Sequence, residues 1–137
     1  MGEIRVRVRL TNAVDEALAR RGQLKPEQVR WSELDALVDT GTVRSVVPPQ
    51  VAQDLGLQLR GQRVAEYADG RKEPVGVTEP LVIECLHRDT LEEALVLGDE
   101  VLIGQTVLEK LDLLADCANG RLVPNPAHPN QPVSKVK

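Results

Sequence analysis

Aromatic residues and cysteine are scarce in this chain of 137 residues. It has no Phe, one Trp (Trp31), one Tyr (Tyr67) and two cysteines, Cys85 and Cys117. The hydrophobic core must therefore be built from Val, Leu, Ile and Ala, and β-branched side chains favour layered β-structure. Two cysteines are too few for the disulfide framework of a small secreted domain, so we expect reduced thiols.

Several partners and cofactors are excluded by what the sequence lacks. No apolar run approaches the roughly 20 residues that span a bilayer, and the first residues have no apolar signal region. A net charge of −4 argues against a nucleic-acid partner. His87 and His128 lie far apart in polar sequence, without the spacing of a zinc site. We therefore expect a cytoplasmic protein with no membrane partner, no nucleic acid, no metal and no cofactor.

Short β-strands dominate the expected secondary structure. Residues 4–10 alternate apolar side chains with Arg, which predicts a half-buried strand, and Asn12 is placed to cap a short helix that Gly22 ends. Further strands are expected at 29–38, 43–47, on both sides of Asp69-Gly70, at 75–85, 91–97 and 101–104, and as a last pair around Asn119-Gly120, with small helices at 50–55 and 105–111. This pattern predicts an all-β fold with one to three short helices, closed into a β-barrel.

The length suggests one domain, at residues 1–124, large enough to bury its own core. Residues 125–137 are rich in Pro and polar residues and cannot bury enough apolar surface to order themselves. We expect this tail to be disordered or to lie on the surface.

The sharpest motif is Asp39-Thr40-Gly41, which follows an apolar strand. An acidic residue at the end of such a strand is costly to bury unless it is paired or hydrogen-bonded. Gly41 lets backbone N–H groups approach the carboxylate, and the Thr40 hydroxyl can join the same network. Alone, the motif is also compatible with an ordinary turn.

A second motif is Val101-Leu102-Ile103-Gly104, an apolar strand ending in glycine just before the predicted helix 105–111. The two motifs, in this order, resemble the retropepsin family of aspartic proteases, and most closely its bacterial single-domain members. Relatives of that kind carry an extra segment after the first strand, which here is the helical segment 12–28. The hairpin of Tyr67, Ala68, Asp69, Gly70 and Arg71 falls where the family has its flap.

The resemblance implies one lobe per chain and a homodimer, in which each chain supplies one catalytic Asp39. It further implies that Thr40, Gly41, Thr42 and Gly104 support the site, and that the flap residues bind a peptide or protein substrate. Family members usually carry Ala or Ser where this chain has Thr42, which keeps a hydroxyl there. The function implied is an aspartic endopeptidase that hydrolyses peptide bonds with activated water.

Two other interpretations stay open on the sequence alone. The domain could be a retropepsin-like dimer used for binding or assembly, with little or no peptidase activity, because fold does not settle function. Alternatively, Asp39-Thr40-Gly41 could be a turn in a simple monomeric β-barrel.

Overall fold

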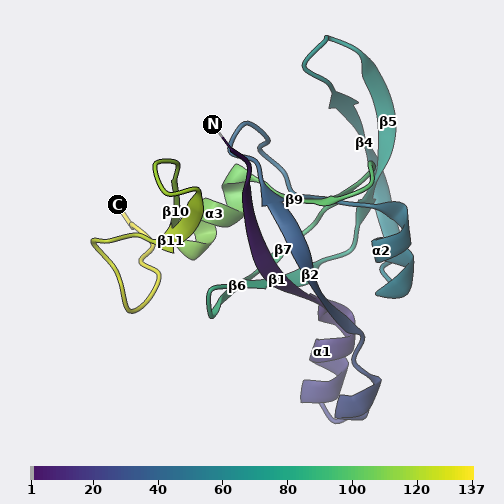
Figure 1. The fold of residues 1–137 in the computed structure, drawn as a ribbon. Helices are drawn as coiled ribbons and strands as arrows, with labels where there is room; N and C mark the ends of the chain where they lie inside the picture. The colour runs from purple at the N-terminus through teal and green to yellow at the C-terminus, as the bar shows by residue number, and fades with distance from the viewer. Residues whose placement is uncertain (1) are drawn as a thin grey trace.

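The computed structural model describes residues 2–137, which form mainly β-structure with three short α-helices (Figure 1). The strands are β1 (Ile4–Asn12), β2 (Trp31–Val38), β3 (Val46–Val47), β4 (Leu59–Glu66), β5 (Lys72–Thr78), β6 (Leu81–Cys85), β7 (Arg88–Glu92), β8 (Leu95–Val96), β9 (Val101–Ile103), β10 (Leu113–Asp116) and β11 (Arg121–Pro124). The helices are α1 (Ala13–Arg20), α2 (Pro49–Asp54) and α3 (Gln105–Leu111), with a 3₁₀ turn, η1, at Pro26–Gln28. None of these helices is long and apolar enough to cross a membrane.

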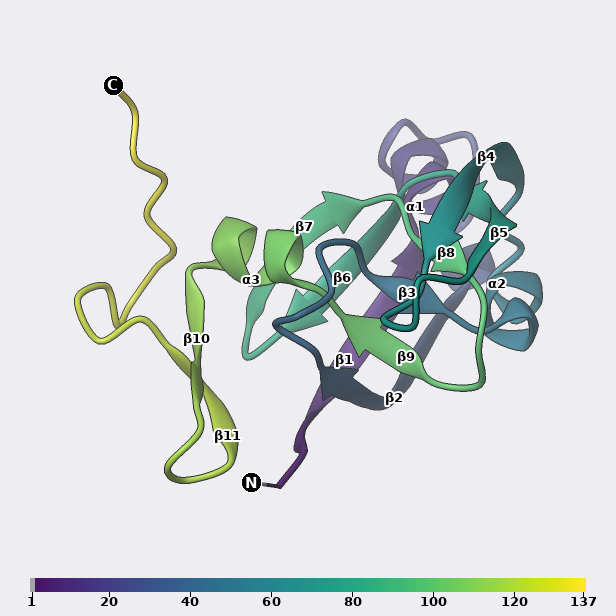
Figure 2. The same cartoon turned by 90° about the horizontal axis from the view of Figure 1, so that it is seen from above.

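Nine strands form one sheet in the order β4-β5-β8-β3-β9-β2-β1-β6-β7, and β10 and β11 form a separate hairpin. The sheet curls around the core as a half-barrel, with β4 and β7 as its two edges (Figure 2). The expected closed barrel is therefore wrong, since no hydrogen-bonded ladder in residues 2–137 joins β4 to β7. The expectation of a mainly β fold with few short helices is confirmed.

The core is aliphatic, as the composition requires. Its fully buried side chains include Leu10, Leu55, Leu81, Ile83, Ile103 and Leu111. The alternation predicted for residues 4–10 is confirmed in β1, where Val8 and Leu10 are buried while Arg5 and Arg7 are exposed. Trp31 is half exposed and lies against the Arg9 guanidinium, so it contributes little to the core.

Helix α1 begins as the sequence indicates. The Asn12 side chain accepts a hydrogen bond from the Asp15 backbone N–H at 3.0 Å, while its own amide donates to the Leu55 carbonyl at 2.8 Å. Asn12 is fully buried, so this single side chain both caps α1 and joins it to the end of α2.

Two local features differ from expectation. Residues 43–45 are not a strand, and only Val46–Val47 pair as β3. The strand expected at 91–97 begins earlier, because the chain turns at Leu86 and His87, which both adopt positive φ, so that Arg88 begins β7 and is buried. The Arg88 guanidinium donates to the carbonyls of Leu111, Asp112 and His128, at the end of α3 and in the segment after β11.

The segment after β11 lies against the end of α3. Asp112 accepts hydrogen bonds from the Asn125 side chain at 3.0 Å and the Val133 backbone N–H at 3.0 Å, and its carboxylate lies 2.6 Å from His128 Nδ1. These contacts, led by the Asn125 bond, lower the pKa of the Asp112 carboxyl. Part of the tail thus lies on the surface of the domain.

Asp15 ties α1 to the start of β2, and its loss should destabilise the protein. Asp15 is buried and its carboxylate accepts two hydrogen bonds from the Arg30 guanidinium, at 2.8 and 3.0 Å. The bond to Arg30 lowers the pKa of Asp15. Asp15→Asn should reduce the free energy of unfolding by about 1–2 kcal/mol at neutral pH. The loss is no larger because Arg30 is half exposed, so that solvent screens part of the interaction.

The pH dependence of this difference follows from the direction of the shift. A lowered folded-state pKa adds stability above the pKa of the unfolded chain, and that stability is lost as the pH falls through the folded-state value. Urea unfolding of wild type and Asp15→Asn should therefore converge below about pH 4. Glu16→Gln, which removes an exposed pair with Arg20, is the matched control and should change little. A difference between wild type and Asp15→Asn that persists unchanged at pH 2 would contradict this account.

Candidate active site

Asp39 is held at the end of β2 by the neighbouring strand. β2 and β9 are parallel, with Val38 opposite Ile103, and the Asp39 backbone N–H donates to the Ile103 carbonyl at 3.0 Å. The chain then turns, since the Thr42 N–H donates back to the Asp39 carbonyl at 3.2 Å. Asp39 therefore sits where the regular pairing of the strand stops and a tight loop begins.

Both carboxylate oxygens of Asp39 accept hydrogen bonds from its own loop. The Gly41 N–H donates to Oδ1 at 3.0 Å, and the Thr42 hydroxyl donates to Oδ2 at 2.8 Å. A Cβ at Gly41 would lie 3.4 Å from Oδ1, an ordinary van der Waals contact, so this hydrogen bond does not by itself require glycine there. Asp39 is partly buried, while Thr40 and Gly41 are exposed, so the carboxylate is fixed in orientation at an open surface.

Gly104 makes a close crossing behind this loop. A Cβ at Gly104 would lie 2.6 Å from both the carbonyl carbon and the oxygen of Arg44, and 2.8 Å from the Val43 oxygen. The Gly104 N–H donates to the buried Ser45 hydroxyl at 3.0 Å. Only a residue without a side chain allows β9 and the loop to approach this closely.

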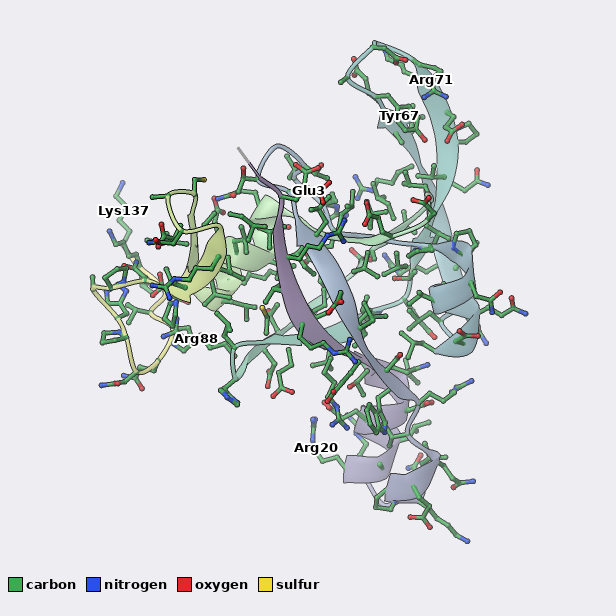
Figure 3. All side chains as sticks on the ribbon, viewed as in Figure 1. Glu3, Arg20, Tyr67, Arg71, Arg88 and Lys137 are labelled. Atoms are coloured by element: carbon green, nitrogen blue, oxygen red, sulfur yellow. The ribbon has the colours of Figure 1, made fainter. Side chains whose placement is uncertain are left out.

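The β4–β5 hairpin projects from the body of the domain and carries the predicted flap residues at its tip (Figures 1 and 3). Two backbone hydrogen bonds close its turn. The Gly70 N–H donates to the Tyr67 carbonyl at 2.9 Å, and the Tyr67 N–H donates to the Arg71 carbonyl at 2.8 Å. Gly70 has φ +85°, which suits the Asp-Gly turn predicted there.

Side chains order the tip of this hairpin. The Tyr67 hydroxyl donates to Glu73, and this bond raises the pKa of Tyr67. The Arg71 guanidinium lies 4.3 Å from the centre of the Tyr67 ring. Asp69 and Ala68 are exposed, and Asp69 accepts a hydrogen bond from the Arg71 N–H at 2.9 Å.

The structure brings some of the predicted site residues together and leaves others apart. Asp39, Gly41, Thr42 and Gly104 form one hydrogen-bonded cluster with the loop. Within residues 2–137, the Thr40 side chain makes no hydrogen bond, and none joins residues 67–71 to residues 39–45. The same described part of the chain contains no cluster of His, Cys, Asp or Glu that could hold a metal ion.

Sequence reasoning missed three residues next to this cluster. The Ser45 hydroxyl accepts a hydrogen bond from the Gly104 N–H, and the Thr106 hydroxyl lies 2.8 Å from the Val43 carbonyl oxygen. The third residue, Glu92, is buried, with 6% of its surface exposed. Thr106 lies 14 residues from Glu92 and 63 from Val43 along the chain. Partners so distant in sequence leave no local pattern, so only the fold reveals the contacts.

Gly104→Ala tests the close crossing. The new methyl group would collide with backbone atoms, which move less easily than a side chain, and should reduce the free energy of unfolding by about 1–3 kcal/mol. Gly61→Ala is the control, because nothing lies within 4 Å of a Cβ there. Thermal melts of both variants check the prediction, and equal melting temperatures would contradict it.

Comparisons with known proteins agree with these features. The aspartyl protease family matches residues 28–115, a range that includes the Asp39 loop, the β4–β5 hairpin and Gly104. Among solved structures, the crystal structure of the retroviral protease-like domain of Ddi1 from Leishmania major aligns with a TM-score of 0.56, covering 98% of this chain and 92% of that chain, at 15% identity. At that identity the likeness shows the fold alone. No curated protein matches the chain. The family match over most of the chain, on a half-barrel of this topology, shows that the chain belongs to the aspartyl protease family and has a retropepsin-like fold.

Proposed function

We propose that this protein is an aspartic endopeptidase that acts as a homodimer, with one Asp39 from each chain in a shared site. The observation that supports this most directly is the Asp39 carboxylate, held by the Gly41 N–H and the Thr42 hydroxyl at an exposed edge. The chain has one Asp-Thr-Gly motif, whereas this chemistry needs two carboxylates. A two-fold axis beside Asp39 supplies the second, because it brings the same residue of both chains to one point.

Two carboxyl groups at such short range cannot both ionise, as is general for aspartic proteases, so the pair shares one proton. The charged carboxylate takes a proton from a water molecule as the water oxygen attacks the scissile carbonyl carbon. The protonated carboxyl gives its proton to the carbonyl oxygen, which forms a tetrahedral diol. Return of a proton to the amide nitrogen then breaks the C–N bond, and the products are a carboxylic acid and an amine.

The loop contacts of Asp39 fit this role. A charged carboxylate is stabilised by donors aimed at it before reaction, and the Gly41 N–H and Thr42 O–H are such donors. Both are fixed by the backbone turn, so little reorganisation accompanies proton transfer. The exposed Thr40 hydroxyl, without a partner in residues 2–137, is free to contact the second chain.

The β4–β5 hairpin is the proposed flap over an extended peptide. Its two strands pair continuously from Gly61 to Glu66, with a register shift between Leu59 and Gly61, and β4 is almost entirely exposed. An extended substrate can bind such a hairpin through backbone hydrogen bonds, as an added strand, with its side chains directed to alternate faces. Tyr67 to Arg71, at the tip, are the proposed contact residues.

We also propose a cytoplasmic location, supported by the state of the cysteines. Both Cys85 and Cys117 are free. Cys85 is buried, and burial raises the pKa of its thiol to about 11, so it is an inert core residue. Free thiols are typical of reducing compartments.

Asp39→Asn tests the proposed function. Asn has nearly the same shape and can keep the Gly41 N–H bond through its carbonyl oxygen, but it cannot shuttle a proton. Hydrolysis of a mixed peptide library should be abolished, while sedimentation should show the same dimer. The melting temperature should be equal to wild type or higher, because repulsion between two carboxyl groups is removed.

The outcomes separate the competing functions. Equal hydrolysis by wild type and Asp39→Asn would remove Asp39 from the mechanism. A stable dimer with no hydrolysis in either protein would favour a binding or assembly domain, and a monomer would favour a simple turn at Asp39-Thr40-Gly41.

A further inference from the structure

A buried acid lies beneath the Asp39 loop, outside the motifs of the proposed site. Glu92, at the end of β7, is 6% exposed. Its Oε1 accepts a hydrogen bond from Lys110 Nζ at 3.0 Å, and its Oε2 lies 2.7 Å from the Thr106 hydroxyl. Lys110 Nζ also donates to the Leu91 carbonyl at 2.9 Å. A carboxylate this buried is costly unless both oxygens are satisfied, and here each has a partner on α3.

Thr106 connects this acid to the loop. Its hydroxyl lies 2.8 Å from the Val43 carbonyl oxygen, and its backbone N–H donates to the same oxygen at 3.1 Å. The preceding N–H, of Gln105, donates to the Thr42 carbonyl at 2.8 Å. The first turn of α3 therefore holds the two carbonyl groups that follow Gly41.

We propose that Lys110, Glu92 and Thr106 form a positioning relay, which sets the orientation of the Asp39 loop without touching substrate. This inference rests on the proposed function and names residues that act through Thr42. The Thr106 hydroxyl has one hydrogen and two acceptors, the Val43 oxygen and Glu92. The Glu92 carboxylate, which is salt-bridged to Lys110, is the stronger acceptor and takes the hydroxyl hydrogen. This bond fixes Thr106, whose backbone N–H then holds the Val43 carbonyl oxygen.

The relay reaches Asp39 through a short stretch of backbone. Val43 directly follows Thr42, whose hydroxyl donates to Asp39 Oδ2 at 2.8 Å. If the Val43 carbonyl moves, that donor and the Gly41 N–H lose their alignment with the carboxylate. The other charged side chain of this loop is Arg44, which faces Glu93 at 3.8 Å and is outside the relay. Loss of the relay should therefore weaken the stabilisation of the charged Asp39.

Thr106→Val removes the hydroxyl and keeps the shape of the side chain. We expect kcat to fall about tenfold with KM within about twofold of wild type, because misplaced catalytic groups affect the reacting complex more than binding. The lower limb of the pH–rate profile should move to higher pH, as it should in Thr42→Ala. Thr106→Ser, which restores the hydroxyl, should return both kcat and the limb to wild-type values.

A double-mutant cycle shows whether Thr106 acts through Thr42. In Thr42→Ala/Thr106→Val, the effects of the two substitutions on kcat and on the pH–rate profile should not add, because both remove the same alignment of donors with the Asp39 carboxylate. Thr78→Val is the control, since the Thr78 hydroxyl is fully buried, accepts a bond from the Ala94 N–H and makes no hydrogen bond to residues 39–45. Thr78→Val should lower the melting temperature and leave the lower limb of the pH–rate profile at its wild-type pH.

Amide exchange gives a readout that does not need hydrolysis. Thr106→Val should speed exchange at the Gly41 and Thr42 amides, and Thr78→Val should not. Faster exchange with a moved pH limb supports the relay. Unchanged exchange and an unmoved limb would overturn it, as would additive effects in the cycle. If wild type and Asp39→Asn hydrolyse peptides equally, the proposed function fails, and the exchange measurement still decides whether the relay holds the loop.

Discussion

The close contact between Gly104 and the carbonyl groups of Val43 and Arg44 is the constraint on which the rest of the site depends. It lets β9 lie beside β2 and still pass behind the loop that begins at Asp39. The same crossing delivers the start of α3 to the carbonyls of Thr42 and Val43. Without it, the Asp39 carboxylate would lose the backbone that aims the Gly41 and Thr42 donors at its oxygens.

This arrangement separates what is rigid from what is open. The aliphatic core and the β1–β2–β9 part of the sheet fix Asp39 from behind, while Thr40 and Gly41 remain at the surface. The β4–β5 hairpin stands away from the body and has its own ordered tip (Figure 1). A rigid carboxylate beside an open edge and a projecting hairpin is what a site completed by a second copy and a bound peptide requires.

Local patterns in the sequence predicted the elements that local physics determines. The alternation in β1, the Asn12 cap, the Asp69-Gly70 turn and the hairpin around Asn119-Gly120 all depend on residues close together in the chain. The family was also recognisable, because Asp39-Thr40-Gly41 and the strand ending at Gly104 are short motifs. The open sheet was not predictable, since whether β4 and β7 meet depends on curvature summed over nine strands. Buried Arg88 and Glu92 were missed because their partners on α3 are far away in sequence.

The central claim is that one site needs Asp39 from two chains, and mixing wild type with the Asp39→Asn chain tests it most directly. Chains are exchanged by dilution and reconcentration, and hydrolysis is measured at fixed wild-type concentration. If the site is shared, each mixed dimer has one carboxyl group and is inactive. With equal amounts and random pairing, activity should fall to about half, and it should approach zero as the variant is added in excess. Activity that stays constant at every ratio, while the chains demonstrably exchange, would show that each chain carries a complete site and would contradict the account.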